Sequence, residues 1–530
     1  MGATLAWVAL AAACTDVHIK GAWCTQDSDC TASPHICDMP RNACETSAAP
    51  IDMLGVDGGG AGDGMVAMCT ADNAVTVCTD PTKPVCSNGT CSQCSGSTDD
   101  AACAARSPTT PRCLPSGDMT PNGGECVACI PAATPTYSAD CAKVASNAPI
   151  CVSDAQGAIS CRACQKNSEC TSGICILDGS SAGTCVDGSA VSTVDNRGML
   201  VATCQAMNPN RNGSSVPYCD VSEAVAAMKS YVLVKGSAQP YGNIALTDQT
   251  IDIVGPGKST TVSAGARLYA SNMASVSFTA TSGGHTVILD GLELGGDTNG
   301  LSLHGVACTN NTGTASNATI IVRNSGLHDS SGEAIQSNGC NLTVDANIIG
   351  VWGSARGNSG GGINLTGINT STITNNIIAG NGGLAAVIAG ITLGSGSTAT
   401  IAFNTIVGNT ASSIGPAGVD CGNNPTTIAS SLFLQNSKSN GSQFGTNCTL
   451  SNVVTFASDG DSKGTMTSGA PGFVSSSDYH LVAGNAVNTA CCIDKIPVTP
   501  APTTPNHAHD VDLTTRPVGP GYDIGANEVH

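Results

Sequence analysis

A short segment recurs along the second half of the chain at a nearly constant interval. Residues 371–381 read STITNNIIAGN, and the related segments read IIVRNSGLHD, LTVDANIIGV, ATIAFNTIVGN and TIASSLFLQN. When the segments are aligned on their alternating apolar residues, successive positions lie 23, 29, 28 and 27 residues apart. Such a period, filled only by short strands and Gly-rich turns, predicts an all-β solenoid: a right-handed parallel β-helix with one coil of about three strands per repeat.

Asparagine recurs at one position of this repeat. Its members are Asn324, Asn347, Asn376 and Asn404, followed by Ser431. Neighbouring coils stack about 4.8 Å apart, so equivalent side chains lie on top of one another. An asparagine at a bend tolerates unusual backbone angles and bonds nearby backbone groups. We therefore expect a structural ladder at this position, and we expect Asn375, which has no such series, to face solvent.

A second polar series lies five residues further along each repeat. It comprises Asp329, Asn381, Asn409 and Asn436, and Trp352 interrupts it. Asn381 and Asn409 follow a glycine at a turn, which predicts a second structural ladder. Asp290 is assigned to the position of the first ladder, so Asp290 and Asp329 both receive a structural interpretation.

Cysteines in the second half follow the same period. Cys308 and Cys340 are 32 residues apart, and Cys421 and Cys448 are 27 residues apart, each about one coil. One coil of rise places the Cα atoms about 5 Å apart, inside the usual disulfide window of about 4.4 to 6.8 Å. Both pairs are predicted disulfides. A third is predicted between Cys204 and Cys219, just before the β-helix.

The first third of the chain is rich in cysteine, with repeating units between Cys24 and Cys185. Each central unit reads Cys, seven to nine residues, Cys, a variable loop and then Cys-x-x-Cys, as in Cys78 to Cys94. Zinc is one interpretation of paired cysteines, since it prefers four soft ligands. Disulfides are the preferred interpretation, because modules this small cannot bury enough apolar surface and need covalent closure.

The amino terminus indicates export. The run ATLAWVALAAAC ends in small residues before Cys14 and resembles a bacterial lipoprotein signal, with Cys14 as the lipidated residue. Removing Cys14 from the 29 cysteines leaves an even number, as full pairing requires. A formal net charge of -19 disfavours nucleic acid as a partner. No other apolar run reaches the length of a membrane span, so we expect no transmembrane helix in the mature chain.

These patterns divide the chain into six parts. They are a signal-like segment (1–13), a cysteine-containing module with a Gly-rich linker (14–68), a disulfide-rich array (69–189), a linker (190–219), the β-helix (220–490) and a closing segment (491–530). Asp220 is the expected N-cap of a helix that covers the first coil.

Two C-terminal motifs carry a family resemblance. GAPGFVSSSDYHLVAGNAVNTA (469–490) and DVDLTTRPVGPGYDIGANE (510–528) resemble the terminal coil and closing motif of secreted bacterial right-handed β-helix proteins, some labelled choice-of-anchor. The motifs GGGIN and FLQN look like those of polymorphic-outer-membrane-protein-type helices. The cysteine units resemble repeats in secreted myxobacterial proteins. The resemblance implies a pectate-lyase-like solenoid behind a stalk or recognition array.

An enzyme of this fold class would need carboxylates around Ca²⁺ and a basic residue nearby. The weak candidates are Glu333, Asp345 and Arg356, without a recognisable lyase motif. His328 beside Asp329 is interpreted as a solvated turn pair, and HAHD (507–510) as part of a disordered loop. No cofactor is expected, and Ca²⁺ would be needed only by a lyase.

The sequence thus predicts an extracytoplasmic protein, secreted or anchored to the outer membrane through Cys14. A structural or adhesive role is preferred over an enzymatic one, with carbohydrate or other surface proteins as expected partners. The alternative is a polysaccharide lyase or hydrolase that acts on an acidic polysaccharide along the β-helix face.

Overall fold

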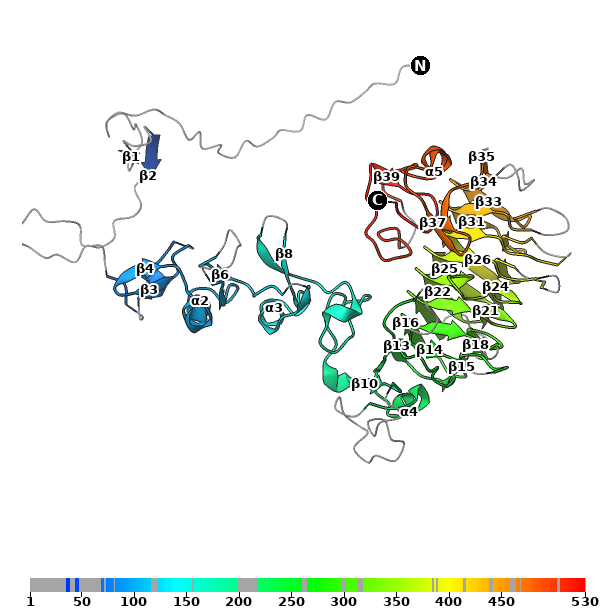
Figure 1. Cartoon of the computed structure of the whole chain (residues 1–530), viewed down its shortest axis with the longest axis horizontal. Helices are drawn as coiled ribbons and strands as arrows, with labels where there is room; N and C mark the ends of the chain where they lie inside the picture. The colour runs from blue at the N-terminus through cyan, green and yellow to red at the C-terminus, as the bar shows by residue number, and fades with distance from the viewer. Residues whose placement is uncertain are drawn as a thin grey trace, which may run out of the picture. The chain divides into compact units, whose positions relative to one another are not determined.

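The computed structural model falls into two compact units, residues 1–68 and 69–530, shown as a cartoon in Figure 1. It describes residues 35–38, 43–46, 68–70, 73–80, 82–115, 123–132, 134–154, 157–197, 217–259, 265–269, 271–296, 301–311, 318–383, 386–387, 389–412, 416–437, 442–456, 464–467, 469–502 and 506–529. The predictions for the signal-like segment, for Cys14 and for Cys204 fall outside these residues. In the first unit, strands β1 (His35–Asp38) and β2 (Ala43–Thr46) form an antiparallel hairpin.

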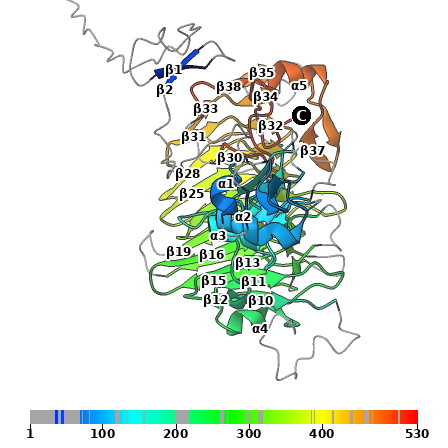
Figure 2. The same ribbon diagram turned by 90° about the vertical axis from the view of Figure 1, so that its left-hand side faces the viewer.

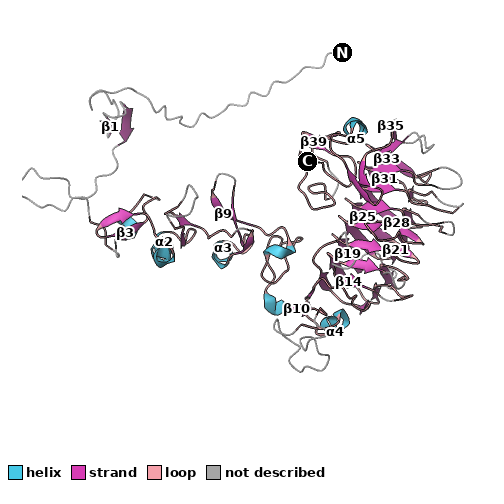
Figure 3. Cartoon of the chain, in the orientation of Figure 1, coloured by secondary structure: helices cyan, strands magenta, loops and turns pink. Residues whose placement is uncertain are grey.

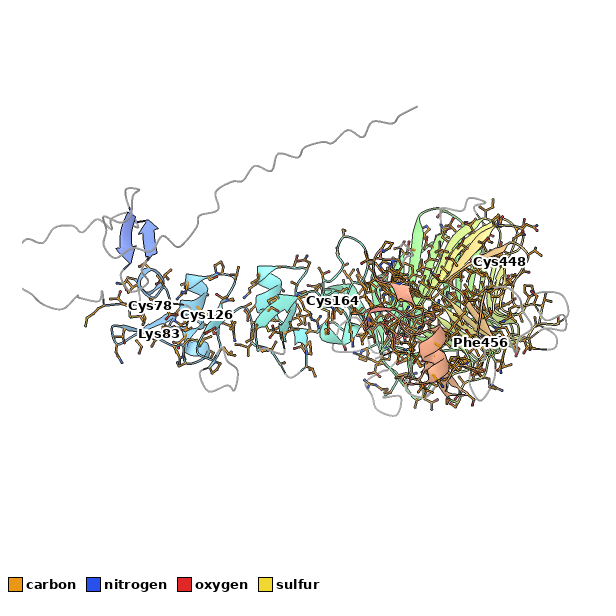
Figure 4. The ribbon with its side chains drawn as sticks, turned by 90° about the horizontal axis from the view of Figure 1, so that it is seen from above. Cys78, Lys83, Cys126, Cys164, Cys448 and Phe456 are labelled. Atoms are coloured by element: carbon orange, nitrogen blue, oxygen red, sulfur yellow. A yellow bond between two sulfur atoms is a disulfide. The ribbon has the colours of Figure 1, made fainter. Side chains whose placement is uncertain are left out.

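Four small modules, 69–91, 94–126, 129–161 and 164–185, begin the second unit, and each holds two crossed disulfides. In every module the first cysteine bonds the third and the second bonds the fourth. The pairs are Cys69–Cys86, Cys78–Cys91, Cys94–Cys113, Cys103–Cys126, Cys129–Cys151, Cys141–Cys161, Cys164–Cys175 and Cys170–Cys185. Figure 4 labels Cys78, Cys126 and Cys164 in three of them. Disulfides, the preferred interpretation, are confirmed for these cysteines.

The predicted phase of the cysteine repeat is wrong by one cysteine. Each Cys-x-x-Cys joins two modules, because Cys91 closes one module and Cys94 opens the next. The short elements of the modules are α1 (Ala74–Val77), β3 (Val85–Ser87), β4 (Thr90–Ser92), α2 (Asp100–Arg106), β5 (Arg112–Cys113), β6 (Cys126–Val127), β7 (Thr136–Tyr137), α3 (Ala139–Val144), β8 (Ile150–Ser153) and β9 (Ile159–Arg162).

The described residues from β10 to β35 form the predicted right-handed parallel β-helix, in which three parallel sheets run along the stack of coils (Figure 2). The predicted end at residue 490 is too late, because β36 and β37 pair antiparallel outside these sheets. The ten-strand sheet contains β10 (Val191–Val194), β11 (Tyr231–Val234), β13 (Ile251–Val254), β16 (His285–Asp290), β19 (Ala318–Arg323), β22 (Asn341–Asp345), β25 (Asn369–Thr374), β28 (Ser397–Ala402), β31 (Thr426–Ala429) and β33 (Cys448–Ser451). The seven-strand sheet contains β12 (Ile244–Thr247), β15 (Val276–Ala280), β18 (Val306–Asn310), β21 (Glu333–Asn338), β24 (Gly361–Thr366), β27 (Ile391–Leu393) and β30 (Val419–Asp420). The nine-strand sheet contains β14 (Arg267–Leu268), β17 (Glu293–Gly295), β20 (Gly326–His328), β23 (Ile348–Gly350), β26 (Ile377–Ala379), β29 (Thr405–Val407), β32 (Leu432–Leu434), β34 (Val454–Phe456) and β35 (Thr465–Thr467).

The core of the coils is a set of aliphatic columns. One column inside the ten-strand sheet consists of Val322, Val344, Ile373, Ile401 and Ile428, which pair in register and are fully buried. β-Branched side chains suit strand backbone because their χ1 is already restricted. Each coil contributes one layer, so the core grows by stacking and needs few aromatic residues.

Helices lie in the modules and at the two ends of the β-helix (Figure 3). Helix α4 (Val221–Ala226) begins as predicted, with the Asp220 side chain accepting a hydrogen bond from the Ser222 N–H at 2.9 Å. The prediction of a linker at 190–219 is partly wrong, since β10 already pairs in parallel with β11. The fourth module packs on this end of the ten-strand sheet, where Ile174 and Val186 join a buried cluster with Leu233.

The C-terminal part contains β36 (Phe473–Ser475), β37 (Asp478–Leu481), α5 (Ala486–Cys491), β38 (Ile496–Pro497) and β39 (Gly521–Tyr522). Its closing segment runs back along several coils. The Ala526 N–H donates to Thr405 Oγ1 at 3.0 Å, and the carbonyl of Asn506 accepts from Asn375 Nδ2 at 2.8 Å. A disulfide between the adjacent Cys491 and Cys492, which the sequence analysis did not predict, lies at the end of α5.

Candidate functional site

The first asparagine ladder is present and structural. Nδ2 of Asn347 donates to Oδ1 of Asn376 at 3.0 Å, and Nδ2 of Asn376 donates to Oδ1 of Asn404 at 3.0 Å. Ser431 Oγ accepts from the Asn404 N–H at 3.1 Å and ends the series. These side chains are fully buried, and each amide also bonds a strand carbonyl, such as Val322 O for Asn347. Their polar atoms already form hydrogen bonds within the fold, as buried polar groups generally do.

The assignment of Asn324 to this ladder is wrong by one residue. Ser325 holds the ladder position, and its N–H donates to Oδ1 of Asn347 at 2.9 Å. Asn324 has a positive φ of 49°, as do its equivalents Ala346 (57°) and Asn375 (57°). Asparagine favours both the left-handed position and the ladder position beside it, so sequence alone confuses the two. Asp290 is likewise not a ladder residue, because it ends strand β16 in register with Arg323.

The prediction that Asn375 faces solvent is also wrong. Its side chain is fully buried, and Nδ2 donates to Oδ1 of Asp345 at 2.9 Å as well as to the carbonyl of Asn506. The closing segment covers this side chain through Asn506, which lies 131 residues further along the chain. The local repeat does not predict such a distant contact.

The prediction that Trp352 interrupts the second ladder is wrong, because Asn358 occupies the ladder position in that coil. Nδ2 of Asn358 donates to Oδ1 of Asn381 at 2.8 Å, and the series continues through Asn409 and Asn436. The turn that carries Trp352 is longer than its equivalents, which shifts the ladder residue along the sequence. Asp329 is not a member of the ladder; the N–H of its neighbour Ser330 donates to Oδ1 of Asn358 at 3.1 Å.

His328 is the centre of a buried charged cluster and not a solvated turn residue. Its ring is 3% exposed and lies between two carboxylates, with Nδ1 2.9 Å from Asp329 Oδ2 and Nε2 3.1 Å from Glu293 Oε2. Strands β17 and β20 pair in register and bring Glu293 and His328 together. Burial opposes the charge on the ring, but the hydrogen bonds with Asp329 and Glu293 outweigh it and raise the pKa of His328 to about 9. A histidine that holds its proton at neutral pH is not a ready general base.

Arg356 completes this cluster at the surface. Its Nε lies 2.5 Å from Asp329 Oδ1, and its side chain is 62% exposed. Burial works against the charge of Asp329, but His328 and Arg356 outweigh it and lower the pKa of Asp329. The cluster of Glu293, His328, Asp329 and Arg356 is therefore an internally compensated set of charges.

The other two predicted catalytic residues lie elsewhere on the coils. Glu333 begins β21 in the seven-strand sheet, 3.2 Å from His304 Nδ1, and accepts from Asn364 Nδ2 at 3.2 Å. Asp345 ends β22 in the ten-strand sheet, 2.7 Å from Nε2 of His509 in the closing segment. The structure does not bring Glu333, Asp345 and Arg356 into one site.

The interpretation of HAHD (507–510) as part of a disordered loop is also wrong. Residues 506–510 are described, and the His509 contact fixes this stretch against the ten-strand sheet. Further on, Lys258 from the turn after β13 donates to the carbonyl of Val511 and lies 3.5 Å from Asp512 Oδ1. Burial lowers the pKa of Lys258, with Asp512 opposing it. Lys258 therefore links the closing segment to the first coils through a hydrogen bond and an ion pair.

Groups of three or more potential metal ligands in the described part of the chain consist of cysteines alone. They are Cys69, Cys78 and Cys91; Cys129, Cys141 and Cys151; and Cys164, Cys170 and Cys185. All of these sulfurs form disulfides, so they do not offer thiolate ligands.

A cavity of about 480 Å³ lies where the fourth module, the first coils and the closing segment meet. Its lining includes Lys166, Lys235 and Lys258 together with Asp290 and Asp512. Both carboxylates already have cationic partners, since Asp290 lies 3.0 Å from Arg323 Nε and Asp512 pairs with Lys258.

The outer surface of the ten-strand sheet carries two columns of uncharged side chains that the sequence analysis missed. The first column consists of Thr286, Thr319, Asn341, Thr370 and Thr398; the second of Ile288, Ile321, Thr343, Thr372, Thr400, Thr427 and Thr449. We call these two columns the threonine face. Its members are half-buried or exposed, whereas the strand residues between them point into the core. Aligning the repeats in the sequence places these threonines at equivalent strand positions, so the threonine face could have been predicted.

Hydrogen bonds run along the face from coil to coil. Oδ1 of Asn341 accepts from the Thr370 N–H at 2.8 Å, and Oγ1 of Thr398 lies 3.4 Å from Oγ1 of Thr370. The column beyond the threonine face, which includes Asp345 and Thr374, is covered by the closing segment. That segment therefore borders the face along one side.

The predicted disulfides within the coils are present. Cys308 bonds Cys340 with a Cα–Cα distance of 6.3 Å, and Cys421 bonds Cys448 at 5.4 Å. Both link neighbouring coils, as their sequence spacing indicated. No helix among the described residues is long and apolar enough to cross a membrane.

Comparison of the chain with protein-family models, curated proteins and solved structures gives no match.

Proposed function

We propose that this chain is an exported cell-surface protein with a structural or adhesive role, whose β-helix presents a contact face to a glycan or a neighbouring surface. The observation that carries the proposal is the threonine face, an uncharged array on a rigid sheet. The acidic candidates Glu333 and Asp345 already contact His304 and His509. The threonine face is a more extended surface for binding than either of these pairs.

The disulfides fit an oxidising, extracellular environment. Anchoring to the outer membrane through Cys14 belongs to the same proposal. In that arrangement the modules act as the spacer between the membrane and the β-helix, and carbohydrate or other surface proteins are the partners.

Retention on insoluble surfaces tests this function. The purified full chain is incubated with a panel of insoluble polysaccharides and bacterial cell-wall preparations, then sedimented. We expect retention on at least one surface and its loss in Thr400→Glu, because a buried carboxylate costs desolvation energy at the contact. The control is Thr366→Glu on the exposed side of the seven-strand sheet, which should be retained like the parent. Retention on no surface would overturn the proposal.

A second candidate function is that of a polysaccharide lyase or hydrolase. One observation favours it: the exposed Arg356 side chain lies beside the buried Asp329 and His328. The test is release of unsaturated uronates from pectin and alginate. Product that disappears in Arg356→Ala would support the enzyme, while equal signals from parent and variant would reject a role for Arg356.

A further inference from the structure

The shape of the threonine face restricts what it can bind. Its two columns are one two-residue strand step apart, about 7 Å, and the stretch from Thr343 to Thr449 covers five stacked strands, about 19 Å. The closing segment borders it along the column of Asp345 and Thr374. The free surface is thus a narrow strip that runs parallel to the axis of the β-helix.

One end of the strip is closed by the fourth module. Ile288 lines a cavity together with module residues 174–181, and Arg323 forms an ion pair with Asp178 of that module. The two isoleucines of the second column lie at this end, whereas its threonines begin at Thr343. Ile288 therefore faces the module, and the hydroxyl-bearing positions of the second column are half-buried or exposed.

The chemistry of the strip is that of a neutral hydrogen-bonding surface. Each threonine offers a hydroxyl that both donates and accepts, beside a methyl group. The β-branched side chain has a restricted χ1, so little conformational entropy is lost on contact. Asn341 adds an amide to the first column. This mixture suits the hydroxyl groups and C–H faces of a sugar chain.

Charge further restricts the class of ligand. The chain carries a formal net charge of -19, so a polyanion such as a uronate polymer approaches against repulsion. The two columns contain no cation that could compensate for it. A neutral ligand avoids both the repulsion and the desolvation of its own charges.

From this geometry we infer that the threonine face binds a single extended strand of an uncharged polysaccharide, laid along the axis of the coils. A linear chain fits a strip two columns wide, and the pyranose repeat of an extended 1,4-linked glycan is close to the coil spacing of about 4.8 Å. Successive sugars can then meet successive threonines. This inference rests on the proposed function and gives its ligand class.

Titration calorimetry with soluble oligosaccharides tests the inference on the full chain. The probes are the neutral hexaoses cellohexaose, hexa-N-acetylchitohexaose and mannohexaose, the corresponding trisaccharides, and a galacturonate hexamer. We expect a neutral hexaose to bind at least tenfold more tightly than its trisaccharide, because the shorter chain spans only part of the five threonine coils. The galacturonate hexamer should bind more weakly than the neutral hexaose.

The double variant Thr372→Val with Thr400→Val removes two hydroxyls from the strip and keeps the shape and strand preference of the side chains. We expect at least a tenfold loss of hexaose affinity with an unchanged melting temperature. The matched control is Thr309→Val with Thr392→Val, at half-buried, outward positions of the seven-strand sheet, and it should bind like the parent.

The outcomes separate the two proposals. If the parent is retained on a surface but binds no neutral hexaose, or binds it equally in the Thr372/Thr400 variant, the inference is wrong while the proposed function stands. If the parent is retained on no surface, the proposed function itself fails.

Discussion

The modules and the coils reach stability by different routes. A module such as 94–126 has a buried cluster made largely of its own half-cystines, including Cys94, Cys103 and Cys113. The coils share one aliphatic core that continues from layer to layer. The difference follows from size, because a unit of about 30 residues cannot bury enough apolar surface by itself, whereas a coil borrows surface from the coils on either side.

Polar groups are also handled differently in the two regions. In the coils, buried asparagine amides satisfy turn backbone and one another in rows. In the modules, turns are short and partly exposed, and covalent bonds restrict the unfolded chain instead. Removal of a disulfide should therefore unfold a module and leave the coils folded. Removal of a ladder asparagine should destabilise the coils and leave the modules folded.

The largest effect is expected from opening one module. Cys141→Ala with Cys161→Ala removes one of two crossed disulfides, at a cost of about 2–5 kcal/mol, which a module with so little other core cannot offset. Limited proteolysis with mass mapping should show new cleavage within 129–161. In the matched variant Cys421→Ala with Cys448→Ala, the coils should remain resistant. Equal resistance of residues 129–161 in parent and variant would contradict this account of the modules.

A smaller effect is expected in the coils from Asn404→Ala. The change removes the acceptor of the Asn376 N–H and the side-chain donor to the carbonyl of Ile373. It also removes the Asn404 amide from the carbonyl of Ala402, which still accepts from the Asn375 N–H. A buried group left without a partner costs about 1–3 kcal/mol. The free energy of unfolding, measured by urea titration, should fall by about 2–5 kcal/mol. Asn423→Ala, at an exposed turn, should stay within about 0.5 kcal/mol of the parent. Similar losses in both variants would mean that the ladder does not contribute.

The ladder and the coil disulfides illustrate what the sequence could predict. The repeat period identified Asn347, Asn376 and Asn404, and the spacing of Cys421 and Cys448 identified a bond between neighbouring coils. Both results depend only on counting residues per coil. The outward threonines follow the same period, but threonine is common in any β-strand, so its recurrence alone does not distinguish a binding face from ordinary strand preference.

The features that could not be predicted from the sequence depend on contacts between segments that the coil repeat does not relate. The burial of Asn375 requires the path of the closing segment, and the environment of His328 requires Glu293 in the preceding coil at an unknown register. The confusion of Asn324 with Ser325 arose because asparagine suits two adjacent positions of the same turn. Local preference does not resolve a shift of one residue.

The smallest effect is a pH dependence confined to the coils. The pKa of His328 is raised from 6.5 to about 9, so its contribution to stability is fully present below about pH 6.5 and is lost as the pH rises through about 9. The melting temperature of the coils should therefore fall between about pH 7 and pH 10. His328→Gln, which cannot carry the charge, should flatten this dependence. Identical slopes in parent and variant would show that the histidine charge does not stabilise the coils.

Hydrogen exchange with and without reductant tests the separation of the two regions most directly. The full chain is incubated with excess TCEP at pH 7, and amide protection is read by mass spectrometry for the modules (69–185) and for the coils from β16 to β33. We predict that reduction removes protection from the modules and leaves the strands of the coils protected, including those beside Cys308 and Cys421. Loss of protection in the coils at the same reductant concentration as in the modules would contradict the account.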